Sequence, residues 1–303
     1  MITETPLSGF DNKLSYTKLN YPQCSCKKCP SMYWNMLSVA ARQSGKTYSI
    51  CKLIKHWEKN SIMKDGEEYD VRTILISPTV QANEIYKSLK SLDFEKDVYE
   101  EYSDSTLLAI IDDVKQRKEE VEEYHEYVKY YKIFAKTPEE KLEALYDKNP
   151  KMFEVLEKHD FAHYKDIPHR KPEVVICVLD DLMGTGSFST KSKSALTNAF
   201  IKNRHIGICF ALLTQSLKAI PKSIRINSSI FLLGKFQNKK IVLEDIYEEI
   251  SNVLKLEEFD ELYTYATDKP YGTLVLDLTN GKRFLCGFDT ELSMAQNKNV
   301  DIK

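Results

Sequence analysis

The sequence predicts an α/β fold built on a mostly parallel sheet, and three observations lead to that prediction. A Gly-Lys-Thr tripeptide, residues 45–47, lies between a short apolar run and a helical pattern. Four further apolar runs have the length and composition of strands buried on both faces: 71–76, 173–179, 206–213 and 229–234. Helical segments separate most of these runs, which is the alternation typical of a parallel sheet.

The composition bounds the class of protein. The chain has 303 residues, enough for one large α/β domain or two small ones with a sizeable core. Charged residues make up 29% and hydrophobic residues 42% of the chain, as in an ordinary globular protein. The net charge of −2 excludes a polycationic surface, so any contact with DNA must come from local basic patches or from a ring that pools them.

The N-terminal part of the chain is irregular. Residues 1–33 contain Pro6, Pro22 and Pro30 and no sustained periodicity, which predicts an arm. Residues 1–19 are polar and lack the apolar core of a signal peptide. No run in the chain approaches the roughly eighteen apolar residues of a membrane span. We therefore expect an intracellular protein without a membrane span.

Three cysteines lie close together in this arm. Cys24, Cys26 and Cys29 form a C-x-C-x-x-C cluster just ahead of the first predicted strand. Three thiols can hold zinc, but a tetrahedral structural site needs a fourth ligand, and no His or Cys lies close by in the sequence. A zinc site and a metal-free turn of reduced thiols both stay open.

The Gly-Lys-Thr tripeptide belongs to a phosphate-binding loop. Residues 36–39 predict the strand that leads into it, and residues 48–57 predict the helix that leads out. In such a loop, backbone N–H groups hold phosphate, the lysine reaches the β- and γ-phosphates, and the threonine hydroxyl binds Mg²⁺. We therefore expect ATP and Mg²⁺ as ligands. The expected nucleotide-binding residues are Ala41, Arg42, Gln43, Ser44, Gly45, Lys46 and Thr47.

One position departs from the pattern G-x-x-x-x-G-K-[ST]. Ala40 occupies the place of the first glycine. Gly45 remains where the backbone comes close to phosphate and a Cβ would clash. We therefore expect the loop to bind nucleotide.

A helical insertion interrupts the predicted sheet between about residues 92 and 170. Residues 112–129 are highly charged, and tyrosines recur near their end. Capping signals predict one helix over 139–146, and a second is predicted over 150–159. The insertion is either a solvated helical flap or a surface that touches a partner subunit, a portal or DNA.

Two carboxylates close the next apolar run. Asp180 and Asp181 directly follow residues 173–179. This is the Walker B position of a P-loop NTPase, where the first carboxylate holds Mg²⁺ and the second polarises the attacking water. We therefore expect Thr47 and Asp180 as metal ligands and Asp181 as a catalytic residue. Adjacent acidic residues also bind Mg²⁺ in nucleases, but a nuclease site would leave Lys46 unexplained.

Further polar residues follow or precede the remaining strands. Gln215 ends the strand after the two aspartates, where it can sense the γ-phosphate or simply face water. Arg204 precedes that strand and can neutralise transition-state charge in a neighbouring subunit. Arg225 competes for this role, and a salt bridge remains an alternative for both arginines. A helix is expected over 239–254, and the Asn-Gly turn at 280–281 predicts a C-terminal β-hairpin.

The order of these motifs resembles that of the genome-packaging ATPases of large double-stranded DNA viruses and virophages, in the poxvirus-type branch of the FtsK–HerA superfamily. The likeness is carried by residues 41–47, 76–79, 178–181, 203–205, 213–215 and 220–227. The last three blocks are the most specific, because a generic NTPase would not need them in this order. The departures are Ala40 and an aspartate, Asp181, in place of a glutamate.

The resemblance implies a RecA-like core and ATP-driven threading of double-stranded DNA into a preformed capsid. It implies a homo-oligomeric ring, a pentamer or hexamer, and a capsid or portal vertex as partner. It suggests Gln215 as the strand-end sensor and Arg204 as the trans-acting arginine, beside Lys46 and Asp181 as catalytic residues. The expected location is the virus assembly site in the host cytoplasm, or the virion.

The expected domain organisation has three parts. Residues 1–33 form the N-terminal arm, residues 34–291 the P-loop ATPase domain with its insertion, and residues 292–303 a polar tail. Three alternative functions stay open. They are a cellular HerA- or FtsK-like translocase, a helicase, and a non-catalytic nucleotide-binding scaffold of the virion.

Overall fold

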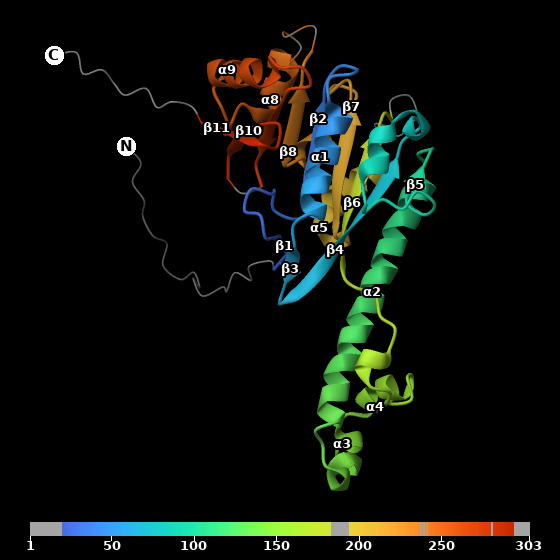
Figure 1. Cartoon of the computed structure of the whole chain (residues 1–303). Coiled ribbons are helices and arrows are strands. Elements are labelled where there is room, and N and C mark those ends of the chain that lie inside the picture. Colours follow the sequence, from blue (N-terminus) through green and yellow to red (C-terminus); the bar gives the residue numbers. More distant parts are fainter. Residues whose placement is uncertain are drawn as a thin grey trace, which may run out of the picture.

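A computed structural model shows the fold of the chain (Figure 1). It describes residues 20–182, 194–236, 238, 240, 242–279 and 281–293. Residues 1–19 of the predicted arm and residues 294–303 of the predicted tail lie outside the described residues.

The described strands form one eleven-stranded sheet. Its order is β1-β3-β4-β6-β7-β2-β8-β9-β10-β11, and β5 pairs with β4. The bounds are β1 Gln23–Cys24, β2 Asn35–Val39, β3 Ile62–Lys64, β4 Glu67–Ile76, β5 Val98–Tyr99, β6 Glu173–Asp180, β7 Ile208–Thr214, β8 Ile230–Gly234, β9 Thr273–Asp277, β10 Arg283–Cys286 and β11 Thr290–Leu292. Strands β4, β6, β7, β2 and β8 are mutually parallel, and antiparallel strands flank them on both sides. The predicted parallel sheet and C-terminal hairpin, β9–β10, are thereby confirmed.

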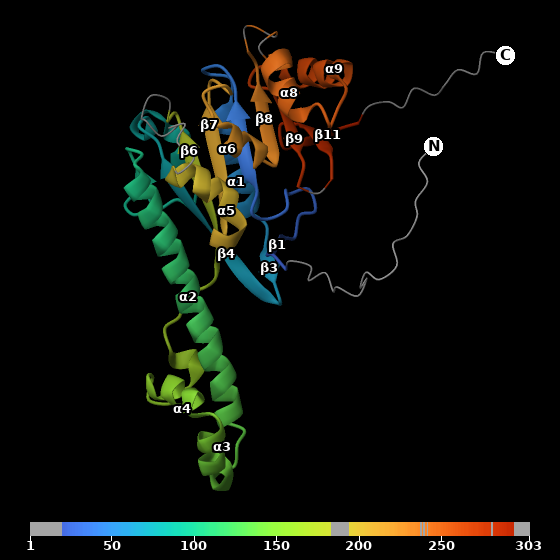
Figure 2. The same ribbon diagram turned by 180° about the vertical axis from the view of Figure 1, so that it is seen from behind.

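Helices cover both faces of this sheet. Their bounds are α1 Lys46–Glu58, α2 Asp104–Phe134, α3 Leu142–Lys148, α4 Pro150–Glu157, α5 Ala195–Ile206, α6 Lys222–Ile226, α8 Tyr247–Ile250 and α9 Leu256–Thr267. Helix α1 lies on one face, and α5 and α6 lie on the other, as the two opposite views show (Figures 1 and 2). Within the described residues, no helix combines the length and the apolar character that crossing a membrane requires.

The alternation of side chains along the central strands builds a core on each face. In β2, Met36 packs in the same cluster as Ile50 of α1. The neighbouring Leu37 and Val39 pack on the opposite face with Phe200 of α5. Successive residues of a strand point to opposite faces, so a strand buried on both sides must be apolar at every position. This requirement explains the continuous apolar runs in the sequence.

Two elements differ from the sequence-based expectation. Strand β4 begins at Glu67 rather than at residue 71, because Asp65 and Gly66 form a tight turn that pairs β3 with β4. Both turn residues have positive φ, 53° and 85°, as a type I′ hairpin turn requires. The helix expected over 239–254 is a π-helical turn, Val242–Ile246, followed by the short α8. A new helix, α9, then begins after Lys255, whose backbone N–H donates to Glu258.

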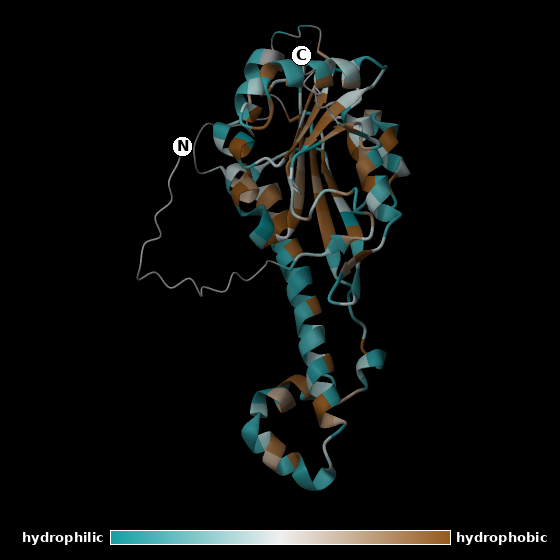
Figure 3. Cartoon of the chain, turned by 90° about the vertical axis from the view of Figure 1, so that its left-hand side faces the viewer, coloured by the Kyte–Doolittle hydropathy of each residue, from teal (hydrophilic) through white to brown (hydrophobic). Residues whose placement is uncertain are grey.

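The insertion is dominated by helix α2. Its 31 residues give a length of about 46 Å. The first half packs on the sheet through Leu107, Ile110 and Val114, and the second half extends beyond the sheet, where α3 and α4 lie beside it (Figure 3). There, a third small hydrophobic cluster forms around Tyr127 and Met152. The helices predicted over 139–146 and 150–159 correspond to α3 and α4.

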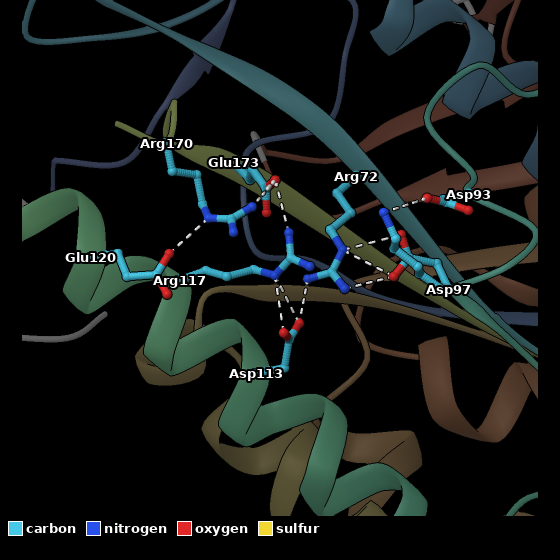
Figure 4. A network of polar contacts seen from close by, with 9 residues as sticks. Arg72, Asp93, Asp97, Asp113, Arg117, Glu120, Arg170 and Glu173 are labelled. Carbon is cyan, nitrogen blue, oxygen red and sulfur yellow. Dashed lines mark hydrogen bonds and ion pairs between the residues drawn. The ribbon is translucent and has the colours of Figure 1, made fainter. Parts of the chain in front are cut away.

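A network of ion pairs fastens α2 to the sheet (Figure 4). Arg72 of β4 donates to Asp97 at 2.6 Å and to Asp113 of α2 at 2.6 Å. Arg72 and Asp97 are buried, with 8% and 5% of their surface exposed. Arg117, one turn further along α2, bonds Asp113 and pairs with Glu173 at the start of β6. Charged groups far apart in the sequence therefore hold the first half of α2 against strands β4 and β6.

Candidate nucleotide-binding site

The phosphate-binding loop joins β2 to α1 and is anchored on both neighbouring strands. The N–H of Ala40 donates to the carbonyl of Thr214 at the end of β7, at 3.2 Å. The N–H of Ala41 donates to the carbonyl of Lys235, just past β8, at 3.4 Å. Gly45, with φ of 91°, turns the chain into the first turn of α1. The loop is therefore held at the carboxyl ends of the central strands, where ligands bind in open α/β sheets.

The alanine at the place of the first glycine packs against a glycine from another strand. A Cβ built on Gly234 would lie 2.6 Å from the Cβ of Ala40 and 3.2 Å from the carbonyl oxygen of Ser44. The absence of a side chain at the end of β8 thus makes room for the methyl group of Ala40.

Gly45 has a second constraint that the sequence does not show. A Cβ on Gly45 would lie 2.9 Å from the carbonyl oxygen of Tyr271, in the turn before β9. The sequence predicts that Gly45 is required by the approach of phosphate. The structure adds that this glycine is also required by the backbone conformation and by the loop packed behind it.

The side chain of Lys46 lies within the loop. Its Nζ donates to the carbonyl oxygens of Ala40 and Ala41, each at 2.8 Å. Burial lowers the pKa of Lys46, and the nearby Asp180 and Asp181 counteract that shift. The ammonium group is therefore already partly desolvated and lies close to both carboxylates, as a group that binds β- and γ-phosphates must be.

Asp180, at the end of β6, lies opposite Thr47 of α1. The Thr47 hydroxyl donates to Oδ2 of Asp180 at 3.2 Å, and the Tyr86 hydroxyl donates to the same oxygen at 2.7 Å. Asp180 is 6% exposed, and its burial raises the pKa, although the bonds from Tyr86 and Thr47 oppose this shift. A hydroxyl and a carboxylate oxygen at this spacing fit a small, hard cation such as Mg²⁺.

Tyr86 is a site residue that the sequence does not reveal. It is fully buried in a short 3₁₀ turn, Glu84–Ser88, and burial raises the pKa of its hydroxyl further above that of an ordinary tyrosine. The hydroxyl therefore remains a proton donor to Asp180. No local pattern distinguishes this residue among the eighteen tyrosines of the chain.

Asp181 and Gln215 meet at the ends of adjacent strands. The Nε2 group of Gln215 donates to Oδ1 of Asp181 at 3.4 Å. Asp181 has a φ of 56°, an uncommon conformation for a residue other than glycine, asparagine or aspartate. This conformation turns the chain directly after β6, and both side chains are half-buried. The two residues lie beside the loop because β7 runs between β6 and β2.

The two candidate arginines lie in different surroundings. Arg204 is exposed in the last turn of α5, beside Tyr33, at the amino ends of the central strands and thus opposite the loop. Within the described residues it makes no ion pair. Arg225 is half-buried and forms an ion pair with Glu249 of α8. The structure therefore brings Lys46 together with the carboxylates and leaves both arginines outside that group.

No protein-family model and no curated protein matches the sequence. The genome packaging NTPase B204 from Sulfolobus turreted icosahedral virus 2, in complex with AMP, is 13% identical, with a TM-score of 0.44 over 81% of this chain and 92% of that chain. B204, the DNA-packaging ATPase from Sulfolobus turreted icosahedral virus, is 12% identical, with a TM-score of 0.41 over 84% and 97% of the two chains. The cytoplasmic domain of the Thermomonospora curvata type VII secretion ATPase EccC is 11% identical, with a TM-score of 0.41 over 86% of this chain and 24% of that chain.

Two of these structures are of viral genome-packaging proteins, and the third is of a secretion ATPase. The fold itself is identified by the strand order of this chain. The strand that ends in Gln215 lies between the strand of the phosphate-binding loop and the strand that ends in Asp180 and Asp181. The chain therefore has the fold of a P-loop ATPase.

Proposed function

We propose that the protein hydrolyses ATP to move double-stranded DNA and packages a viral genome into a preformed capsid at the assembly site in the host cytoplasm. One observation carries the hydrolytic part of the proposal. Lys46, Thr47, Asp180, Asp181 and Gln215 come from the ends of two strands and the start of one helix, and they converge at the carboxyl ends of the central strands. A buried strand with solvated acidic residues at its end would not need the other three residues.

The chemistry expected at this site is attack of water on the γ-phosphorus of ATP. The bond between that phosphorus and the bridging oxygen of the β-phosphate breaks, and ADP and phosphate are released. Asp181 orients the water and accepts its proton, while Gln215 fixes the carboxylate of Asp181. Lys46 neutralises charge on the phosphates. Mg²⁺, for which Thr47 and Asp180 provide ligands, supplies further positive charge to the phosphate oxygens.

The DNA-translocating part of the proposal is supported by the order of the motifs. The segments at 203–205, 213–215 and 220–227 follow the two aspartates in the order found in the packaging ATPases that the sequence resembles. Arg204 lies at the amino ends of the central strands, whereas the loop of its own chain lies at their carboxyl ends. In a ring, Arg204 would therefore act on the nucleotide of the adjacent subunit. A pentamer or hexamer would also pool basic patches around a duplex, as a chain with net charge −2 requires.

The decisive experiment measures the ATPase rate of the full chain with and without linear duplex DNA, together with the mass of the assembly. We expect the duplex to stimulate turnover and the mass to be several times that of one chain. Binding of ATP without DNA-dependent turnover would instead favour a virion scaffold. Strand separation on a forked substrate would favour a helicase, and failure to package DNA into capsids would favour a cellular translocase.

A further inference from the structure

The cysteines of the N-terminal segment meet a histidine that the sequence places far from them. The ligand atoms of Cys26, Cys29 and His56 lie within 4.8 Å of one another. Cys24, like Cys26, packs against the hydrophobic cluster that contains Cys29. His56 lies in the last turn of α1 and is exposed. The fold thus supplies the fourth ligand that the sequence alone does not place near the cysteines.

We propose that Cys24, Cys26, Cys29 and His56 bind one Zn²⁺ ion in a closed structural site. Three thiolates and one imidazole are a ligand set that favours zinc with tetrahedral coordination. With a Zn–S distance of about 2.3 Å, tetrahedral sulfur ligands lie about 3.8 Å apart. The ligand atoms of Cys26, Cys29 and His56 therefore have to approach one another by at most about 1 Å when the ion binds, and the Cys24 thiol has to turn towards them, which side-chain rotation can achieve.

The backbone already presents the cysteines on one side of a turn. The N–H of Cys29 donates to the carbonyl of Cys26 at 3.0 Å, which folds the C-x-x-C segment back on itself. Before this turn, Cys24 pairs with Ile62 of β3, and the N–H of Ser25 donates to the carbonyl of Ser61 at 2.8 Å. Both segments that carry the thiols are therefore fixed independently of a metal, and only the side chains need to move.

The surroundings suit a metal better than a redox pair. All seven cysteines of the chain are free thiols. A redox-active pair requires an accessible thiol, whereas Cys29 is buried. A disulfide would also leave His56 without a role.

The proposed zinc site is separate from the nucleotide-binding site. Helix α1 begins at Lys46 beside the phosphate-binding loop, and His56 lies ten residues, about 15 Å, further along the same helix. The ion would connect the N-terminal segment, which is already paired with β3, to the far end of α1. Trp57, next to His56 and fully buried, already anchors that end of the helix in the core. A structural role is therefore expected, with no part in the hydrolytic chemistry.

The test is the zinc content of the full chain, purified without a polyhistidine tag under reducing conditions and measured by plasma mass spectrometry. We expect about one zinc ion per chain. Cys29→Ser and His56→Ala should each lose at least about nine-tenths of that zinc and lower the melting temperature. Cys286→Ser is the matched control, because it removes a half-buried thiol outside the cluster, and it should keep its zinc.

The absorption spectrum of the wild-type chain loaded with cobalt tests the ligand set without relying on a variant that has to fold. The wild-type chain loaded with Co²⁺ should show thiolate-to-cobalt charge-transfer absorption and the intense visible bands of tetrahedral coordination. His56→Cys should keep the metal and shift these bands, because a thiolate replaces the imidazole. The proposal is overturned if the reconstituted wild-type chain holds no zinc, if Cys29→Ser keeps its full zinc content, or if the cobalt spectrum lacks the charge-transfer band.

Discussion

At the scale of a single residue, the surroundings of Asp180 fit the cation that we propose it binds. Its carboxylate is nearly fully buried and receives hydrogen bonds from Tyr86 and Thr47, yet its pKa remains raised. Folding therefore disfavours the charged form of this group relative to the unfolded chain. A buried carboxylate of this kind costs stability that a bound cation can restore.

A substitution that removes only the charge should separate stability from function. We expect Asp180→Asn to lower the ATPase rate by about 10²-fold or more while leaving the melting temperature at pH 7 unchanged or higher. The ordinary pKa of 3.8 is raised on folding, so the native carboxylate destabilises the protein above that raised pKa. The stability advantage of the variant should shrink as the pH falls towards 3.8. Calorimetry across this range, with ATPase assays at neutral pH, is the measurement.

Tyr86→Phe tests whether the buried tyrosine positions Asp180. Loss of the 2.7 Å hydrogen bond should lower the ATPase rate by about tenfold or more and reduce the free energy of unfolding by about 1–3 kcal/mol. Tyr102→Phe is the matched control, because Tyr102 is also buried and donates to a carboxylate, that of Asp104, away from the site. A control variant that lost as much activity as Tyr86→Phe would contradict the positioning role.

The contact between Ala40 and Gly234 allows a double-mutant cycle. Gly234→Ala should weaken ATP binding and destabilise the protein by about 1–3 kcal/mol, because the two methyl groups would overlap. Adding Ala40→Gly removes that overlap and should recover part of the loss. Nucleotide affinity and urea unfolding of both single variants and the double variant provide the coupling energy. If Gly234→Ala lowers stability and nucleotide affinity equally with and without Ala40→Gly, the contact between positions 40 and 234 is not the cause of the loss.

The residues predicted from the sequence are those that belong to contiguous motifs. Lys46 and Thr47 stand in a loop pattern, and Asp180 and Asp181 close a long apolar run. Tyr86 could not be predicted, because it meets Asp180 across 94 positions of the chain through tertiary packing alone. The same reason hides His56 from the cysteine cluster.

At the scale of elements, the insertion is fastened by charges rather than by hydrophobic contacts alone. The sequence predicts helices from capping signals and charge density, and α3 and α4 lie where those signals place them. It does not predict that α2 begins on the core sheet, because the partners Arg72, Asp97 and Asp113 come from three separate segments. In the sequence, each of these three residues looks like an ordinary charged residue of a solvent-exposed surface.

Removing Arg72 should be costly because it leaves a buried carboxylate without its partner. We expect Arg72→Ala to lower the free energy of unfolding by about 3–5 kcal/mol, since Asp97 is 5% exposed. Arg170→Ala, which breaks the exposed pair with Glu120 in the same region, should cost less than about 1 kcal/mol. Urea titrations of the two variants, monitored by circular dichroism, compare these costs directly. Similar losses in both variants would mean that burial of the Arg72 pair contributes little.

At the scale of the whole molecule, the position of Arg204 bears on how subunits assemble. Arg204 lies at the amino ends of the central strands, opposite the phosphate-binding loop, so a contact with nucleotide requires a second subunit. Arg225 is engaged with Glu249 within its own chain. This difference favours Arg204 as the arginine that acts on a neighbour.

Arg204→Ala should lower ATP hydrolysis by about 10³-fold or more while nucleotide binding is retained. Mixed with Lys46→Ala subunits, which lack a working loop but keep Arg204, the variant should regain activity, because its intact loop then receives the arginine of a neighbour. Arg225→Ala should instead act mainly on stability. Mixed assemblies of Arg204→Ala and Lys46→Ala subunits that stay inactive would contradict a role across the subunit interface.

Helix α2 has a mechanical consequence. It runs from Asp104 to Phe134 without a proline or glycine at which it could kink, so its two halves move as one rod. Its inner half is held on the sheet by the ion pair of Arg72 with Asp113, and its outer half, residues 118–134, is about 25 Å long. A tilt of only 5° at the clamp would displace the tip by about 2 Å. The insertion thus acts as a lever arm: a small rotation of helix α2 at the sheet produces a larger displacement at its far end, where a partner could bind.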